Sequence, residues 1–120
     1  MNIRRIVPDI VTDKMEASKK FYSDFFELKL AMDLGWVATL ISTSNETAQV
    51  TLVKGVPPLS NDLTIALTIE VENVDAVYQK AKDAGLKIIY PMTDEPWGVR
   101  RFHISDPNGV VINVMTHLSK

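Results

Sequence analysis

Residues 99–116 read VRRFHISDPNGVVINVMT, in which two runs of alternating side chains flank the segment Asp106-Pro107-Asn108-Gly109. Alternation with a period of two is typical of a half-buried β-strand, because successive side chains point to opposite faces of the sheet. The Asp-Pro-Asn-Gly segment is typical of a tight turn. The stretch therefore predicts two strands, Val99–Ser105 and Val110–Thr116, joined by that turn.

The alternation also sorts the side chains of this hairpin into two faces. One face is apolar and suits a core covered by a helix; its members are Phe102, Ile104, Val110, Ile112 and Val114. If the opposite faces of both strands look toward the same side of a curled sheet, they bring four side chains into one concavity. These four are Arg101, His103, Asn113 and Met115.

The residues before the hairpin predict a strand, a helix and a further strand. Leu63–Glu72 has strand composition, and Asn73 is placed to cap a helix whose apolar stripe ends at Gly85. Leu86–Tyr90 is the next predicted strand. The second half of the chain is thus expected to run strand, helix, strand, strand, strand.

The first half predicts the same order of elements. Ile3–Thr12 is rich in β-branched residues but contains Pro8, which predicts an edge strand or a break there. Asp13 and Glu16 form a pattern that favours a helix start. The aromatic residues of the helix recur at helical spacing and are expected to pack on a sheet: Phe21, Tyr22, Phe25 and Phe26. The predicted strands that follow are Leu28–Met32, Trp36–Ser42 and Gln49–Lys54, and the connector to the second half is Gly55–Asp62.

Composition limits the class of protein. With 120 residues, 46% hydrophobic and 23% charged, the chain is expected to form one globular domain. A net charge of −2 provides no basic field for nucleic acid. There is no cysteine, which excludes disulfides and thiolate sites. No membrane span and no signal peptide are recognisable, so we expect a cytoplasmic protein that binds neither nucleic acid nor membrane.

Several side chains are candidates for ligand binding, each with an ordinary alternative. Asn113 is costly inside a strand of Val and Ile unless it is hydrogen-bonded, but backbone or water could satisfy it. His103 could act in acid–base chemistry or be a partly exposed strand residue. Arg101 could neutralise an anionic ligand or be a solvated surface charge. Trp36 and Trp97 could stack on a planar ligand, and Trp97 lies on a Pro/Gly-bounded loop as an anchor or a lid.

Sequence motifs of known catalytic or phosphate-binding sites are absent. The chain has no Gly-rich phosphate loop, no G-x-S-x-G elbow and no H-x-x-x-H pair. No catalytic residue is therefore assigned from the sequence.

Three stretches together resemble the vicinal oxygen chelate superfamily, which includes glyoxalase I, extradiol dioxygenases and bleomycin-resistance proteins. Residues 11–28, VTDKMEASKKFYSDFFEL, resemble its V-x-D…A-S-x-x-F-Y opening. Residues 71–78, VENVDAVY, resemble the start of its second-module helix, and residues 101–109, RFHISDPNG, resemble its F-x-x-x-D-P-x-G hairpin. The set covers nearly the whole chain in the right order.

The resemblance implies an α+β fold of two βαβββ modules, here about 1–55 and 62–118 within one domain of residues 1–120. It further implies curled mixed sheets that form clefts, and a homodimer. Metal-dependent members hold a divalent cation with His and Glu at four strand positions. Those positions correspond here to Ile6 or Val7, Thr51, Ala66 and Asn113. None of these is a good ligand, so the resemblance is closer to the metal-free, bleomycin-resistance-like branch.

Three functions remain as hypotheses. The first is a metal-free protein, without cofactor, that binds a small molecule and could sequester an antibiotic; its predicted ligand-binding residues are Trp36, Thr51, Trp97, Arg101, His103, Asn113 and Met115. The second is a lyase, isomerase or dioxygenase that uses His103 as base and holds a divalent metal through Glu70 or His117. The third is an interaction module with an empty cleft.

Overall fold

The structure is a computed structural model that describes residues 1–55 and 66–118. The chain divides into two compact units, Met1–Leu59 and Ser60–Lys120. Each unit contains one four-stranded mixed sheet and the order strand, helix, strand, strand, strand. The predicted α+β fold of two βαβββ modules is thereby confirmed.

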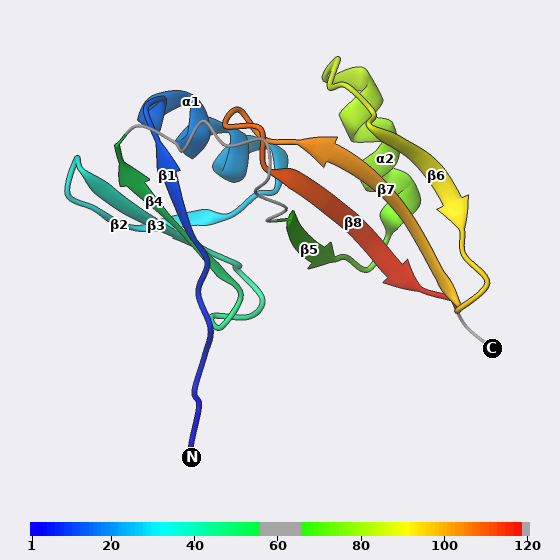
Figure 1. Ribbon diagram of the computed structural model, residues 1–120, viewed down its shortest axis with the longest axis horizontal. Coiled ribbons are helices and arrows are strands. Elements are labelled where there is room, and N and C mark those ends of the chain that lie inside the picture. Colours follow the sequence, from blue (N-terminus) through cyan, green and yellow to red (C-terminus); the bar gives the residue numbers. More distant parts are fainter. Residues whose placement is uncertain (56–65, 119–120) are drawn as a thin grey trace. The chain divides into compact units, whose positions relative to one another are not determined.

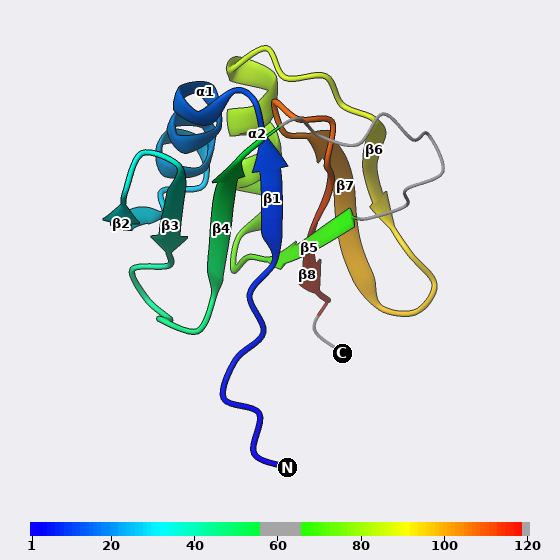
Figure 2. The ribbon, with the colours of Figure 1, turned by 60° about the vertical axis from the view of Figure 1, so that its left-hand side comes forward.

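The sheet of the first unit has the strand order β1-β4-β3-β2 (Figure 2). Strands β1 and β4 are parallel, and the other neighbours are antiparallel. The elements of this unit are β1 (Asp9–Thr12), α1 (Met15–Lys20), the π-helical turn η1 (Phe21–Phe25), β2 (Lys29–Asp33), β3 (Val37–Ile41) and β4 (Gln49–Lys54).

Strand β1 is shorter than the predicted Ile3–Thr12, because it begins only after Pro8. Strand β1 lies at the edge of the sheet, and Pro8 directly precedes it. The prediction of an edge strand or a break at Pro8 is therefore confirmed. The carbonyl of Pro8 still accepts a hydrogen bond from the Thr51 amide at 3.0 Å. Proline has no amide hydrogen to return, and the ladder therefore stops there.

The expected capping of the first helix by Asp13 is wrong. The N-cap position is Lys14, without a side-chain capping bond, and Thr12 supplies the local polar contacts instead. The Thr12 hydroxyl accepts a hydrogen bond from the Lys14 amide at 2.9 Å and lies 3.1 Å from the Ser18 hydroxyl. The buried end of β1 thus orders the start of α1.

The aromatic stripe after α1 is buried in part, as its helical spacing predicted. Tyr22 and Phe25 are buried, and the ring of Phe21 stacks on that of Phe25 at a centroid distance of 5.7 Å. The ring of Phe26 meets that of Phe25 edge-on at 4.8 Å. These rings form the aromatic part of the core of the first unit.

The sheet of the second unit has the strand order β5-β8-β7-β6 (Figure 1). Strands β5 and β8 are parallel, and β8, β7 and β6 are antiparallel. The elements are β5 (Ala66–Glu70), α2 (Val74–Asp83), β6 (Tyr90–Asp94), β7 (Val99–Ser105) and β8 (Val111–His117).

Most predictions for the second unit hold, with one clear error. Strand β7 has the predicted bounds, whereas β6 starts at Tyr90, where the predicted strand Leu86–Tyr90 ends. The chain leaves α2 through Gly85 at φ 72°, and the Leu86 amide still bonds the Ala81 carbonyl at 3.0 Å. Residues 86–89 connect the helix to the sheet and do not form the start of the predicted strand. The start of the predicted strand Leu63–Glu72 and all but Gly55 of the predicted connector lie outside the described residues.

Helix α2 covers one face of the second sheet. The Asn73 side chain accepts a hydrogen bond from the Ala76 amide at 3.1 Å, which confirms the predicted cap. The Tyr78 ring contacts the Phe102 ring at a centroid distance of 4.9 Å. Strand residues on this face are fully buried: Phe102, Ile104, Ile112 and Val114. Neither helix in the described part of the chain could cross a bilayer, since each is too short and too polar.

Candidate functional site

The face of the second sheet opposite α2, called here the helix-free face, carries the four side chains that alternation placed together. The register pairs His103 with Asn113 and Arg101 with Met115 across β7 and β8. Because paired residues of neighbouring strands point to the same side, all four lie on this face. The structure therefore brings together the predicted Arg101, His103, Asn113 and Met115.

Arg101 is held between two aromatic rings and a carboxylate. Its guanidinium carbon lies 5.2 Å from the centre of the Trp97 ring and 5.3 Å from that of Tyr90. Its Nη2 and Nε lie 2.8 and 2.9 Å from Glu95 Oε2. Only 9% of the Glu95 side chain is exposed. The cation is thus already neutralised within the protein, which argues against both sequence-based alternatives, an anion receptor and a solvated charge.

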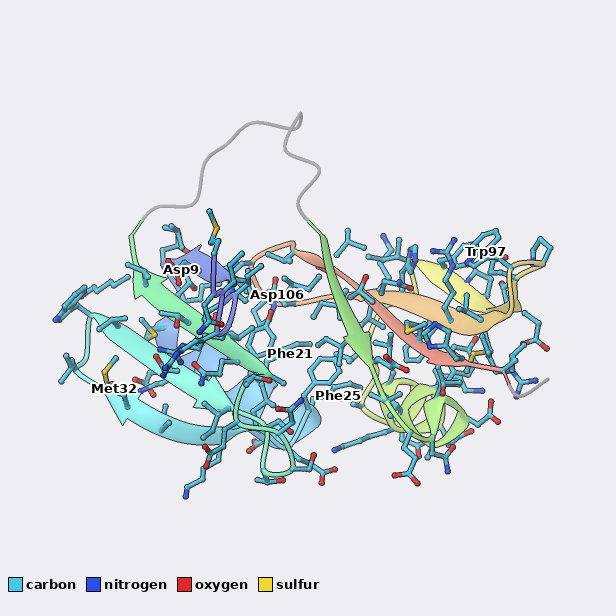
Figure 3. All side chains as sticks on the ribbon, turned by 90° about the horizontal axis from the view of Figure 1, so that it is seen from below. Asp9, Phe21, Phe25, Met32, Trp97 and Asp106 are labelled. Atoms are coloured by element: carbon cyan, nitrogen blue, oxygen red, sulfur yellow. The ribbon has the colours of Figure 1, made fainter. Side chains whose placement is uncertain are left out.

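Trp97 lies in the turn between β6 and β7, on the side of the second sheet away from α2 (Figure 3). The turn closes through the Glu95 amide, which donates to the Val99 carbonyl at 2.8 Å, and Gly98 has φ 89°. The indole exposes 64% of its surface although it also contacts Arg101. A large ring that is fixed at one side and exposed elsewhere is suited to stacking on a planar molecule.

Two residues of this cluster, Tyr90 and Glu95, were not among the predicted site residues. The Tyr90 hydroxyl donates to the Glu95 carboxylate at 3.2 Å, and its ring lies 4.9 Å from that of His103. The register places Tyr90 opposite His103. A correct position for β6 would have revealed Tyr90 by the same alternation that found His103, whereas Glu95 could have been found only through its place beside Trp97 in the loop.

His103 and Asn113 each carry a buried polar atom without a hydrogen bond. These atoms are His103 Nε2 and Asn113 Oδ1, the two such side-chain atoms among the described residues. The other amide atom, Asn113 Nδ2, donates to Thr68 Oγ1 at 3.3 Å. Buried polar atoms without partners are rare in proteins because they have lost their water. The two atoms belong to residues paired in the β7–β8 register, and each calls for a hydrogen-bond partner.

His103 is disposed to be neutral. Burial lowers its pKa below the ordinary value of about 6.5, and the nearby charge of Arg101 lowers the pKa further. Asn113 and Glu95 act in the opposite direction with smaller effect. A neutral imidazole has one donor and one acceptor nitrogen, so it can take part in either kind of hydrogen bond.

The two remaining predicted site residues, Trp36 and Thr51, belong to the first unit. Trp36 precedes β3 and exposes 59% of its surface. The Thr51 hydroxyl lies 3.3 Å from that of Thr39 on the neighbouring strand. Their role in ligand binding stays a prediction.

The four positions that correspond to the metal ligands of metal-dependent relatives offer a poor donor set. Only Thr51 and Asn113 carry an oxygen, and both oxygens are neutral. The alternative ligands considered from the sequence, Glu70 and His117, do meet, with His117 Nδ1 3.0 Å from Glu70 Oε2. Among residues 1–55 and 66–118, however, no group of three or more His, Cys, Asp or Glu side chains is placed to hold a metal ion.

Comparison with known proteins identifies the family. The model of the glyoxalase/bleomycin resistance protein/dioxygenase superfamily matches residues 3–114. A comparison with curated protein sequences gave no match.

Solved structures with the same fold include the antibiotic-binding protein TnmS3 from Streptomyces sp. CB03234, with a TM-score of 0.81, 22% identity and 98% coverage of both chains. TioX from Micromonospora sp. ML1 has a TM-score of 0.78 and 19% identity over 95% of this chain and 98% of TioX. A glyoxalase/bleomycin resistance protein/dioxygenase from Nocardioides has a TM-score of 0.73 and 20% identity over 99% and 87%. With the family model matching almost the whole chain, this protein belongs to the glyoxalase/bleomycin resistance protein/dioxygenase superfamily.

Proposed function

We propose that this protein binds a small planar molecule on the helix-free face of its second sheet, without a metal ion, and that binding sequesters the molecule. The observation that carries the proposal is the stack of Trp97, Arg101 and Tyr90 beside two buried, unpaired polar atoms. A ligand site combines an apolar wall with a few convergent polar groups, and this face supplies both.

Three features support stacking as the main source of affinity. The guanidinium is planar and held by Glu95, so a ring that binds against Trp97 meets a surface with little freedom left to lose. The exposed indole provides apolar area at low conformational cost. Met115 is buried on the same face, paired with Arg101 in the β7–β8 register, and adds a polarisable side chain.

The metal-free part of the proposal rests on the donor set. A catalytic divalent ion needs about three protein ligands with charged or strongly basic donors. A threonine hydroxyl and an asparagine amide at the corresponding positions do not meet that need, and Asn113 already donates to Thr68. The antibiotic-binding relative TnmS3 supports sequestration as the biological outcome.

The proposal is tested by isothermal titration calorimetry and intrinsic tryptophan fluorescence with a panel of planar metabolites and antibiotics. We expect at least one panel member to bind the parent protein and to lose affinity in the Trp97→Ala variant. A panel that is silent toward the parent, or binding that Trp97→Ala leaves unchanged, contradicts the proposal.

A divalent-metal-dependent lyase, isomerase or dioxygenase is the second candidate function, and the Glu70–His117 contact favours it. Both side chains are well exposed, at 61% and 67%, so the pair is open to an ion from solvent. Elemental analysis of protein expressed in metal-supplemented medium decides between the two. Stoichiometric bound cation that is lost in His117→Gln would favour the enzyme and contradict the metal-free proposal.

We also propose that the protein acts as a homodimer in the cytoplasm. Strand β2 is an edge strand whose residues are all exposed, Leu30 and Met32 among them (Figure 3). Exposed apolar side chains on an edge strand favour association with another chain. Sedimentation velocity should show a dimer that Leu30→Lys weakens, and cell fractionation tests the location.

A further inference from the structure

The amide of Asn113 is oriented by its neighbour on β5. Asn113 Nδ2 donates to Thr68 Oγ1 at 3.3 Å, and Thr68 and Asn113 are paired in the β5–β8 register. This contact uses the donor end of the amide and leaves the acceptor, Oδ1, without a partner. A carbonyl-type oxygen can only accept, so Oδ1 requires a donor.

On the β7 side, the register pairs Asn113 with His103, whose Nε2 is also buried and without a hydrogen bond. A ring nitrogen that carries a proton is the donor that Oδ1 lacks. In the amide orientation that Thr68 accepts, a small rotation of either side chain would let Nε2–H donate to Oδ1 and satisfy both atoms at once. Nδ1, the second ring nitrogen, is not enclosed in this way and has no hydrogen bond from the described residues.

We propose that Asn113 is a positioning residue which holds His103 as the Nε2–H tautomer, so that Nδ1 offers its lone pair to a ligand that carries a neutral hydroxyl or N–H donor beside its planar ring. This inference rests on the proposed function and specifies the chemistry of its ligand. The orientation passes from Thr68 through Asn113 to His103, as outer groups orient the ligating or catalytic imidazoles of other proteins.

The surroundings of His103 exclude charged ligand groups. A carboxylate or phosphate would meet the lone pair of Nδ1, and the nearest cation, Arg101, is already paired with Glu95. An ammonium group would find no counter-charge, because the nearby carboxylate of Glu95 is already paired with Arg101. A neutral donor, as in a phenol, an enol or a ring N–H, meets neither obstacle.

The tautomer is tested directly by long-range ¹H–¹⁵N NMR of histidine-labelled protein. The chain has two histidines, and the exposed one is removed by His117→Gln so that one ring is observed. We expect the Nε2–H pattern in this background and a mixture of tautomers after Asn113→Leu. An Nδ1–H pattern, or a pattern that Asn113→Leu does not change, overturns the inference.

The ligand class is tested by fluorescence titration with 2-naphthol, 2-methoxynaphthalene and 2-naphthoate. These probes share a ring and differ in carrying a donor, no donor or a negative charge. We expect 2-naphthol to bind at least about fivefold more tightly than the other two. The preference over 2-methoxynaphthalene should vanish in His103→Phe and in Asn113→Leu. Ser105→Ala changes the same strand and face and should preserve it.

The outcomes separate the two proposals. Equal binding of 2-naphthol and 2-methoxynaphthalene by the parent protein overturns the inference about the donor and leaves the binding function intact. No binding of any of the three probes, together with a silent antibiotic and metabolite panel, overturns the binding function. Loss of the preference in Ser105→Ala as well as in Asn113→Leu would show a general effect on the face and overturn the role given to Asn113.

Discussion

Glu95 accepts hydrogen bonds from Arg101 at 2.8–2.9 Å while only 9% of the Glu95 side chain and 25% of the Arg101 side chain are exposed. The pair fixes the guanidinium carbon 5.2 Å from the ring centre of Trp97 and 5.3 Å from that of Tyr90. Arginine on a sheet face usually suggests a binding site for an anion. Here the Glu95 carboxylate already pairs with Arg101 in place of such an anion. The guanidinium is therefore part of an aromatic platform rather than a free charge.

Glu95→Gln should lower the free energy of unfolding by about 1–3 kcal/mol, because it replaces a partly buried, charge-assisted bond by a neutral one. Asp94→Asn is the matched control, since Asp94 pairs with Arg100 in the same hairpin but is 53% exposed. Solvent screening should make its cost clearly smaller than that of Glu95→Gln. Urea denaturation measures both, and equal costs would contradict the structural role of Glu95. Glu95→Gln should also strengthen binding of 2-naphthoate, because Arg101 loses its counter-charge.

Trp97→Ala should weaken binding of 2-naphthol about three- to tenfold, which corresponds to the loss of one aromatic contact. Its effect on the melting temperature should be small, because most of the indole is exposed. Trp36→Ala removes a similarly exposed indole from the first unit and is the matched control. We expect it to leave the affinity within about twofold. A loss of the same size in Trp36→Ala would assign the first unit to the site as well.

Asn113→Leu should lower the free energy of unfolding by no more than about 1–2 kcal/mol while it abolishes the preference for 2-naphthol. The substitution removes the acceptor proposed for the buried His103 Nε2, but the leucine side chain has a similar shape and fills the same space. Thermal denaturation by circular dichroism compares it with Thr68→Val, which should be close to neutral. A fall of more than about 2 kcal/mol in Asn113→Leu would show that the amide is needed for folding.

Stability should fall as the pH is lowered through about 6.5, because burial lowers the pKa of His103 in the folded state. The unfolded chain then binds the proton more readily than the folded chain does. The charged and titratable groups around His103 are Arg101, Glu95 and Tyr90, and the pair Glu70–His117 lies at the end of the same sheet. Unfolding of His117→Gln is compared with that of the double variant, which adds His103→Gln and should lose this dependence.

Two carboxylates, Asp94 and Asp33, have a lowered pKa and titrate below that range of pH. The pKa of Asp94 is lowered by its hydrogen bond to Arg100, and that of Asp33 by its hydrogen bond to Lys19. Their contributions to stability are present above the unfolded pKa of about 4 and are lost only as the pH falls below it. A stability that stays level between about pH 7 and 5 would contradict the environment assigned to His103.

Asn73→Ala should cost about 1 kcal/mol, because it leaves the Ala76 amide without its capping acceptor. Asn73→Asp is the control and should retain stability, since a carboxylate accepts the same bond and favours a helix N-terminus. Urea denaturation measures the difference. Equal destabilisation by both substitutions would indicate that the backbone at this position matters more than the cap.

Local patterns in the sequence predicted the elements whose signals are contained within a few residues. Strand β7 has its predicted bounds, and Asn73 caps α2 as predicted. Alternation likewise placed four side chains on one face: Arg101, His103, Asn113 and Met115. The period of two decides to which face each side chain of a strand points, whichever strands pair with it. These successes required only backbone periodicity and capping chemistry.

The errors arose where a contact between distant residues decides the local structure. Strand β6 begins at Tyr90 because it pairs with His103, thirteen positions along the chain by residue number. The start of α1 depends on Thr12 rather than Asp13, because the end of β1 brings the Thr12 hydroxyl to the Lys14 amide. The Asn113 and Thr68 side chains meet across 45 positions of sequence. The pairs Tyr90–His103 and Thr68–Asn113 are too far apart for a short window of sequence to contain both partners.

The amino-acid sequence by itself determined the order of elements and the faces of the last two strands, because these depend on residue type and spacing alone. The weak metal-donor set followed from the resemblance to the family. Tertiary structure alone decided the state of each side chain on that face. It neutralised Arg101 with Glu95 and left Trp97 largely exposed. It also buried His103 Nε2 and Asn113 Oδ1, on residues paired in the register, without hydrogen-bond partners. Charge pairing and burial depend on distances through space, and these exist only once the strands have paired.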